Sequence, residues 1–151
     1  MLRERLTDAL KESMRGQEKR RTTTLRLILA AIKDRDIAGR EDGSRDLVGD
    51  DEVTQLLQKM VRQRRESIES FEKGGRMELA DQERTEIAII EEFLPQQMGE
   101  AEIAAAVDSV VAELGASSLK DMGKVMAALR ERYPGTMDFG KASAVTKARL
   151  S

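Results

Sequence analysis

The chain has 151 residues and a mass of 16.9 kDa, which suits one domain or two small ones. Charged residues make up 36% of it and aromatic residues 3%, and it contains no His, Cys or Trp. These absences exclude disulfides, thiol nucleophiles, His-dependent triads and zinc sites built from His and Cys, so we expect no metal and no cofactor. The formal net charge of −2 gives the chain no general attraction to nucleic acid or to anionic membranes.

The sequence contains no candidate membrane segment. No apolar run approaches the roughly 18 residues that cross a bilayer. Residues 1–16 carry charges throughout and lack the apolar centre of a signal peptide. We therefore expect a cytoplasmic protein with no membrane partner.

Apolar residues recur every three or four positions through most of the chain, as they do on one face of an α-helix. This pattern predicts a first helix that ends near Gly16 and a second helix that stops before Gly39. Residues 39–50 are polar and punctuated by glycine, so we interpret them as a loop.

Two longer helices are predicted next. Asp50 or Asp51 is expected to cap the first of them, and the glycine pair at 74–75 ends it, with the left-handed conformation common there. Pro95 stops the second, because proline cannot continue a helix.

Three shorter helices are predicted after Pro95. Ser117 or Ser118 is expected to cap the middle one, with Leu119 on its inward face, and Asp138 to cap the last. The helical spacing throughout predicts an all-α protein. The shorter helices and lower charge after Pro95 predict an N-terminal four-helix unit, residues 1–95, and a smaller C-terminal three-helix unit, residues 96–151.

Sequence motifs for catalysis are absent. No Ser lies in a G-x-S-x-G turn, and neither a G-x-x-x-x-G-K-[ST] nor a G-x-G-x-x-G phosphate loop occurs. The acidic run at 50–52 is rich enough in carboxylates to attract Mg²⁺, but adjacent helical residues point in different directions, which favours a capping and helix-dipole role. We predict no catalytic, cofactor-binding or metal-binding residue.

Two opposite charges fall on apolar stripes of the two longer helices. Arg64 lies on the stripe that includes Leu57 and Met60, and Glu83 lies on the stripe that includes Ile87. If the stripes face each other, Arg64 and Glu83 form a buried ion pair, which would fix the register of the helices. The alternative is that the pair belongs to a functional site.

Six basic residues are candidates for RNA contacts. Basic residues gather at 19–21 and 59–65, whereas residues 78–102 are mainly acidic, so these segments either neutralise one another or leave a basic strip for a partner. Gly123 is expected inside a helix, where it permits close approach of either another helix or a ligand. The candidates are Lys59, Arg62, Arg65, Lys120, Lys124 and Lys141.

Three segments together resemble the GatB/YqeY family over essentially the whole chain. They read TLRLILAAIK, KMVRQRRESIESFEKGGRMELADQERTEIAIIEEFLPQQM and DMGKVMAALRERYPGTMDFGKASAVTKARL. The family comprises small helical proteins related to the tail domain of the aspartyl/glutamyl-tRNA amidotransferase B subunit. The residues that match its two conspicuous blocks are Arg62, Arg65, Ser67, Arg76, Glu83 and Glu86, and then Gly123, Lys124, Met126, Gly135 and Asp138.

The resemblance implies an association with tRNA, because the related tail helps to hold the tRNA while amidation occurs elsewhere in that enzyme. It also implies carbon–nitrogen ligase activity with glutamine as amide donor, for which this chain lacks a nucleophile and a nucleotide loop. We therefore expect a tRNA-associated accessory protein that does not catalyse amidotransfer alone. The alternatives are a protein–protein adaptor to an amidotransferase or synthetase, and an accessory subunit of a ligase.

Overall fold

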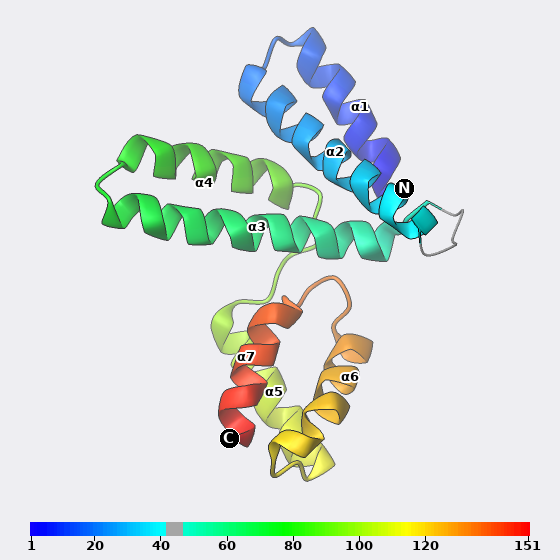
Figure 1. Ribbon diagram of the computed structural model, residues 1–151, viewed down its shortest axis with the longest axis vertical. Coiled ribbons are helices and arrows are strands. Elements are labelled where there is room, and N and C mark those ends of the chain that lie inside the picture. The colour runs from blue at the N-terminus through cyan, green and yellow to red at the C-terminus, as the bar shows by residue number, and fades with distance from the viewer. Residues whose placement is uncertain (42–46) are drawn as a thin grey trace. The chain divides into compact units, whose positions relative to one another are not determined.

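The computed structural model describes residues 1–41 and 47–151, and of residue 41 the backbone only. The described residues form seven α-helices and one short 3-10 helix, and they contain no strand, which confirms the all-α prediction (Figure 1). The chain divides into two compact units, Met1–Leu94 and Pro95–Ser151.

The first two helices, α1 (Leu2–Arg15) and α2 (Lys19–Glu41), form an antiparallel pair (Figure 1). Gln17 turns the chain between them with a φ of 57°, and a buried hydrogen bond of 2.8 Å joins the hydroxyl groups of Ser13 and Thr22. The expected end of α2 before Gly39 is wrong, because the helix continues to Glu41. A Cβ atom at Gly39 would meet nothing within 4 Å, so no neighbouring atom requires glycine at this position. The rest of the predicted loop, at 42–46, lies outside the described residues.

The next pair comprises α3 (Asp50–Lys73) and α4 (Met77–Glu91). Gly75 has a φ of +72° at the turn between them, as predicted for the glycine pair. The expected cap at Asp50 or Asp51 is wrong, because Gly49 is the N-cap and neither side chain caps α3. Instead, Asp50 Oδ1 accepts a hydrogen bond of 3.2 Å from the backbone N–H of Leu2, at the start of α1.

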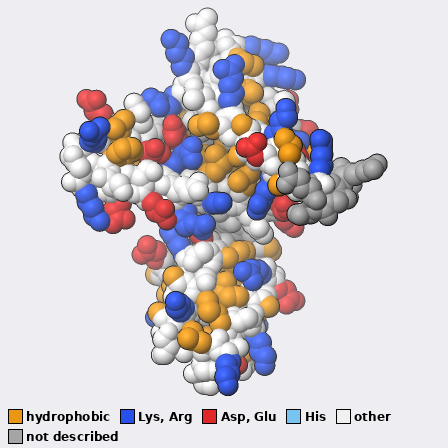
Figure 2. All heavy atoms as spheres, in the orientation of Figure 1, with side chains coloured by type: hydrophobic (Ala, Val, Ile, Leu, Met, Phe, Trp, Pro, Cys, Tyr) orange, Lys and Arg blue, Asp and Glu red, His pale blue; other side chains and the backbone are white. Residues whose placement is uncertain are grey.

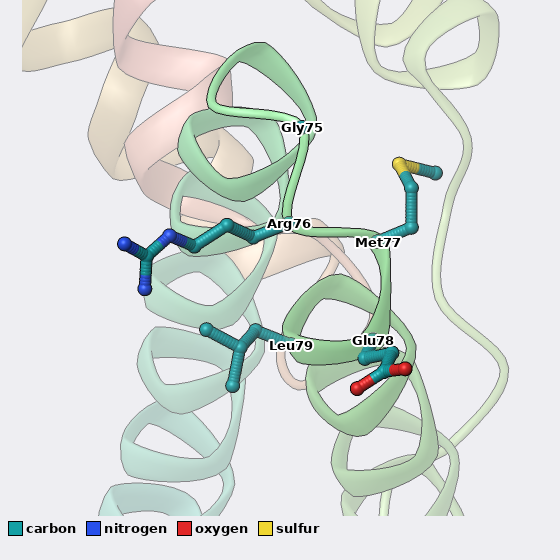
Figure 3. A pocket seen from close by; sticks show the side chains of 5 residues that line it. All are labelled: Gly75, Arg76, Met77, Glu78 and Leu79. Carbon is teal, nitrogen blue, oxygen red and sulfur yellow. The ribbon is translucent and has the colours of Figure 1, made fainter.

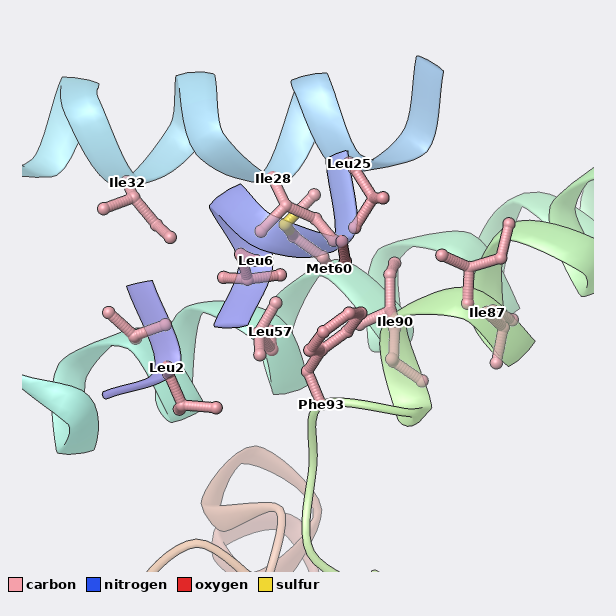
Figure 4. Packing of buried hydrophobic residues seen from close by; sticks show 14 residues of the cluster. Leu2, Leu6, Leu25, Ile28, Ile32, Leu57, Met60, Ile87, Ile90 and Phe93 are labelled. Atoms are coloured by element: carbon pink, nitrogen blue, oxygen red, sulfur yellow. The ribbon is translucent and has the colours of Figure 1, made fainter. Parts of the chain in front are cut away.

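All four helices of the first unit contribute to one core. Figure 4 shows Leu25, Ile28 and Ile32 of α2 pointing toward α1, α3 and α4. The helical spacing of apolar residues produces this arrangement, because each helix presents one apolar stripe to the others. The core residues are Leu2, Leu6, Ala9, Leu25, Ile28, Ile32, Val53, Leu57, Met60, Val61, Ile87, Ile89, Ile90 and Phe93.

The second unit contains α5 (Glu100–Leu114), the 3-10 helix η1 (Leu119–Asp121), α6 (Met122–Arg132) and α7 (Phe139–Leu150). Asp138 caps α7 as predicted, with its side chain accepting hydrogen bonds from the backbone N–H groups of Gly140 and Lys141. The expected inward position of Leu119 is wrong, because this side chain is 50% exposed at the start of η1. The unit has its own core, formed by Ile103, Ala106, Val107, Val110, Val125, Met126, Leu129, Met137, Ala142 and Leu150.

Candidate nucleic-acid interface

Arg64 lies at the centre of a charged cluster between α2, α3 and α4. Its Nε is 3.8 Å from Glu83 Oε2, so the structure brings the two predicted partners together. Glu86 is nearer, with Nε donating to its Oε2 at 3.0 Å, and Glu86 also lies 3.7 Å from Arg20 on α2. The side chains of Arg64, Glu83 and Glu86 are 14%, 23% and 15% exposed, so the cluster is mostly buried.

Glu83 occupies an unfavourable position for a carboxylate. Burial raises its pKa above the usual value, and the neighbouring Glu86 raises the pKa further, against the opposing effect of Arg64. Arg64 also donates to the carbonyl of Met60 at 3.4 Å. This network ties three helices together, which is the structural role that a partly buried ion pair performs.

Most basic residues of the 19–21 and 59–65 segments face acidic residues of the same unit. Arg65 lies 3.9 Å from Glu91, and Arg21 donates to Glu92 at 2.5 Å. Figure 2 accordingly shows Lys and Arg side chains interspersed with Asp and Glu side chains over α3 and α4. Lys59 is exposed and Arg62 is half-buried. Of the three candidates on α3, the structure therefore pairs Arg65 with an acidic residue of the fold and leaves Lys59 without an ion pair to any described residue.

A different situation holds where η1 meets α6. Lys120 and Lys124 are four residues apart, are both exposed, and form no ion pair with any residue that the structure describes. Between them lies Gly123, which is also exposed. We call these three residues, Lys120, Gly123 and Lys124, the lysine patch.

Gly123 leaves open space at the centre of the lysine patch. A Cβ atom added there would meet nothing within 4 Å, so close packing against another helix of this chain does not explain the glycine. Of the two alternatives for Gly123, close packing against another described helix is therefore wrong, and the glycine leaves its backbone open to an external group.

The acidic residue nearest the patch is used within the fold. Asp121 Oδ2 accepts hydrogen bonds from the backbone N–H groups of Ser117, at 3.0 Å, and Ser118, at 3.4 Å. These N–H groups lower the pKa of Asp121, with a smaller contribution from Lys124. The turn therefore fixes the carboxylate of Asp121, and of the two lysines only Lys124 contributes to its electrostatic surroundings.

Lys141 lies away from the lysine patch. It is half-buried in the first turn of α7, and the guanidinium of Arg130 lies 5.8 Å from the ring centre of Phe139 in the same turn. The start of α7 is therefore beside the end of α6, whereas the patch is at the beginning of α6 (Figure 1). The structure brings together Lys120 and Lys124 but not Lys141.

The turn between α3 and α4 forms an open hollow of about 520 Å³, lined by Gly75, Arg76, Met77, Glu78 and Leu79. Figure 3 shows Arg76 and Leu79 on one side of the turn and Met77 and Glu78 on the other, so the two charged groups, Arg76 and Glu78, do not converge on one point. Elsewhere in the described residues, no group of three or more acidic side chains is placed to hold a metal ion. None of the described helices is both long and apolar enough to cross a membrane.

Comparison with known proteins identifies a family and several curated relatives. The sequence model of Yqey-like proteins matches residues 3–150. The chain is 37% identical over 123 residues to altered inheritance of mitochondria protein 41, mitochondrial, of Lachancea thermotolerans, covering 76% of this chain and 63% of that protein. The protein of the same name from Eremothecium gossypii is 35% identical over 112 residues, covering 72% of this chain and 58% of its own length.

A third relative is an uncharacterized protein of Schizosaccharomyces pombe, 30% identical over 87 residues, which cover 58% of this chain and 67% of that protein. The chain thus spans about three fifths of the length of the first two curated relatives that it matches.

Proposed function

Because this chain belongs to the YqeY-like family, we propose that it is a tRNA-associated helical accessory protein that does not catalyse amidotransfer alone. The enzyme that it assists would be a tRNA-dependent amidotransferase or a synthetase. Its resemblance to the tRNA-holding tail of the amidotransferase B subunit supports this proposal. The compartment would be one that holds tRNA: the cytoplasm or, as in the names of two fungal relatives, the mitochondrion.

The observation that carries the proposal is the lysine patch. Lys120 in η1 and Lys124 in the first turn of α6 are both exposed and only four residues apart in the chain, which would let both ammonium groups contact phosphates of one RNA backbone. The missing side chain at Gly123 lets that backbone approach the helix closely. Contacts of this kind recognise charge and shape, and the 3% of aromatic residues leaves few rings for stacking on bases.

The proposal is tested by replacing both lysines. We expect the double variant Lys120→Gln/Lys124→Gln to bind bulk tRNA roughly tenfold more weakly than the natural chain in a fluorescence titration at low salt. The matched control is Lys11→Gln/Lys147→Gln, which removes the same charge from two exposed lysines on α1 and α7. Equal affinity of the two double variants would contradict a specific role for the patch.

An adaptor that binds another protein is the second candidate. Leu114 and Leu119, on either side of the α5–η1 connection, are 47% and 50% exposed, and a partner protein would bury them. A pull-down before and after nuclease treatment separates the two functions: a partner that survives nuclease favours the adaptor. An amidation assay with the chain alone, and then with an added amidotransferase, tests the third possibility, an accessory subunit of a ligase.

A further inference from the structure

The outer face of α2 carries basic residues that form no ion pair with described residues of the fold. This helix contains seven basic and three acidic residues. Its inner face buries Leu25, Ile28 and Ile32 in the core of the first unit (Figure 4). The opposite face is exposed along most of the helix, and none of the core contacts explains its composition.

Apolar residues lie along the middle of this exposed face. Leu27 and Ile37 are 46% and 45% exposed, and Ala30 between them is also exposed. At 100° per residue these three positions fall within one narrow stripe, which also includes Thr23 and Asp34. The centre of the solvent face of a helix is normally its most polar part, so exposed Leu and Ile there require an explanation.

A line of cations borders the apolar stripe. Lys19, Arg26, Lys33 and Arg40 follow one another at seven-residue intervals, which places them almost in a straight line, about 10 Å apart. No ion pair joins any of the four to another residue in the described part of the chain. Figure 2 shows Lys and Arg side chains together with exposed hydrophobic atoms over the α1–α2 pair.

Among the described residues, no carboxylate forms an ion pair with these cations. Arg26 donates to the sulfur of Met14 at 3.3 Å, which does not neutralise its charge. Arg40 lies near Asp36 and slightly lowers its pKa, but both oxygens of Asp36 already accept hydrogen bonds from Arg3, at 2.9 and 3.0 Å. The cations on the outer face therefore differ from Arg3 and Arg64, which the fold pairs with carboxylates.

We infer that the outer face of α2 is a docking surface for an amphipathic helix of a partner protein, with acidic residues beside its apolar stripe. Seven residues is the repeat at which side chains of two packed helices meet, so a carboxylate in each heptad of the partner would face one cation of α2. Leu27 and Ile37 favour a protein over RNA, because an RNA backbone would leave these apolar side chains without a matching surface. Ala30 between them allows the two helices to approach closely.

A designed peptide tests this surface directly on the full chain. The probe is a fluorescent peptide of roughly three heptads with Leu at positions a and d and Glu at e and g, and its control has Lys in place of Glu. We expect the Glu peptide to bind, the Lys peptide not to bind, and Leu27→Ser/Ile37→Ser to weaken binding by about tenfold or more. Leu114→Ser, at a similarly exposed leucine of the second unit, should leave binding unchanged.

The charges are tested in the same assay. Arg26→Gln/Lys33→Gln should weaken binding of the Glu peptide, whereas Lys11→Gln/Lys147→Gln, with the same loss of charge, should not. Because all these side chains are exposed, circular dichroism and melting temperature should show that the variants fold. Absence of binding by the Glu peptide would overturn the inference. Equal binding of both peptides would also overturn it, as would a change in tRNA binding by Arg26→Gln/Lys33→Gln with no change in peptide binding. If this inference is correct, Lys120→Gln/Lys124→Gln still binds the Glu peptide. The peptide assay and the tRNA assay therefore test the two proposals independently.

Discussion

Glu83 and Glu86 lie three residues apart on α4, and both face Arg64, yet their surroundings differ. Glu86 accepts a hydrogen bond from Arg64 at 3.0 Å, whereas Glu83 lies 3.8 Å from the same nitrogen. Burial and the neighbouring Glu86 raise the pKa of Glu83. The charged form of Glu83 therefore destabilises the folded state, and protonation of the carboxyl group removes this destabilisation.

This difference predicts opposite effects of two similar substitutions. Since the pKa of Glu83 is higher in the folded than in the unfolded chain, its ionisation lowers the free energy of unfolding as the pH rises through that pKa. Glu83→Gln should thus raise the melting temperature at neutral pH, and the gain should shrink in acidic buffer. Glu86→Gln should lower the melting temperature, because it breaks the nearest contact of Arg64. Thermal unfolding over a pH series measures both, and a loss of stability in Glu83→Gln at neutral pH would contradict this account.

Asp36 predicts a pH dependence of the opposite sign. The guanidinium of Arg3 lowers the pKa of this buried carboxyl group, and the backbone N–H of Val48 lowers it further. The resulting stability is present above the unfolded-state pKa of Asp36 and is lost as the pH falls through the lower pKa of the folded state. Asp36→Asn should reduce the free energy of unfolding by roughly 3 kcal/mol at neutral pH, since Arg3 loses its charged partner. Urea titrations check this, and an equal loss at acidic pH would contradict the stated cause.

Single residues also show where sequence patterns stop being informative. Helical spacing could place Arg64 and Glu83 on facing stripes, because it decides which residues share a face. It could not identify Glu86 as the nearer partner, because Glu83 and Glu86 share that face and the offset between two helices depends on the packing of the whole core. The exposed position of Leu119 was missed for a related reason: a 3-10 turn changes the direction of side chains relative to the α-helix that follows.

At the level of helices, glycine has two distinct roles. Gly75 and Gly115 have φ values of +72° and +62° at helix ends, where the left-handed conformation favours glycine. Gly39 lies in the last turn of α2 and Gly123 in the first turn of α6, and an added Cβ atom at either position would meet nothing within 4 Å. The sequence pattern indicates a loop at Gly39 and leaves both close packing and a ligand open at Gly123, because it does not show whether a helical glycine faces a neighbour or solvent.

Alanine substitutions separate these roles. Gly39→Ala and Gly123→Ala should each raise the free energy of unfolding by about 0.5–1 kcal/mol, because alanine favours the helix and meets no obstruction. Gly75→Ala should lower it, because its backbone is left-handed. If an RNA backbone approaches Gly123 closely, Gly123→Ala should also weaken tRNA binding, and Gly39→Ala should not. Denaturant unfolding and tRNA titration of the same three proteins test this, and unchanged tRNA binding by Gly123→Ala would exclude close approach at that point.

At the level of the whole molecule, two separate helical cores distribute the charge differently. In the first unit, four arginines of α2 and α3 face glutamates in α4 or at its end, whereas the cations on the outer face of α2 form no ion pair with described residues. In the second unit, Arg132 and Arg149 pair with Glu113 and Asp108, while Lys120 and Lys124 form no ion pair with described residues. Composition and periodicity could predict the all-α class and most helix ends, because these depend on local sequence. They could not predict which cations remain unpaired, because pairing depends on how the helices pack.

The salt dependence of tRNA binding tests the central proposal most directly. Fluorescence titration of the full chain with bulk tRNA over a series of salt concentrations gives the slope of log K against log salt, to which each lysine–phosphate contact adds somewhat less than one. We expect weak binding at low salt with a shallow slope, reduced by roughly one to two in Lys120→Gln/Lys124→Gln and unchanged in Lys11→Gln/Lys147→Gln. Absence of binding at low salt, or an equal slope in the two double variants, would contradict the account.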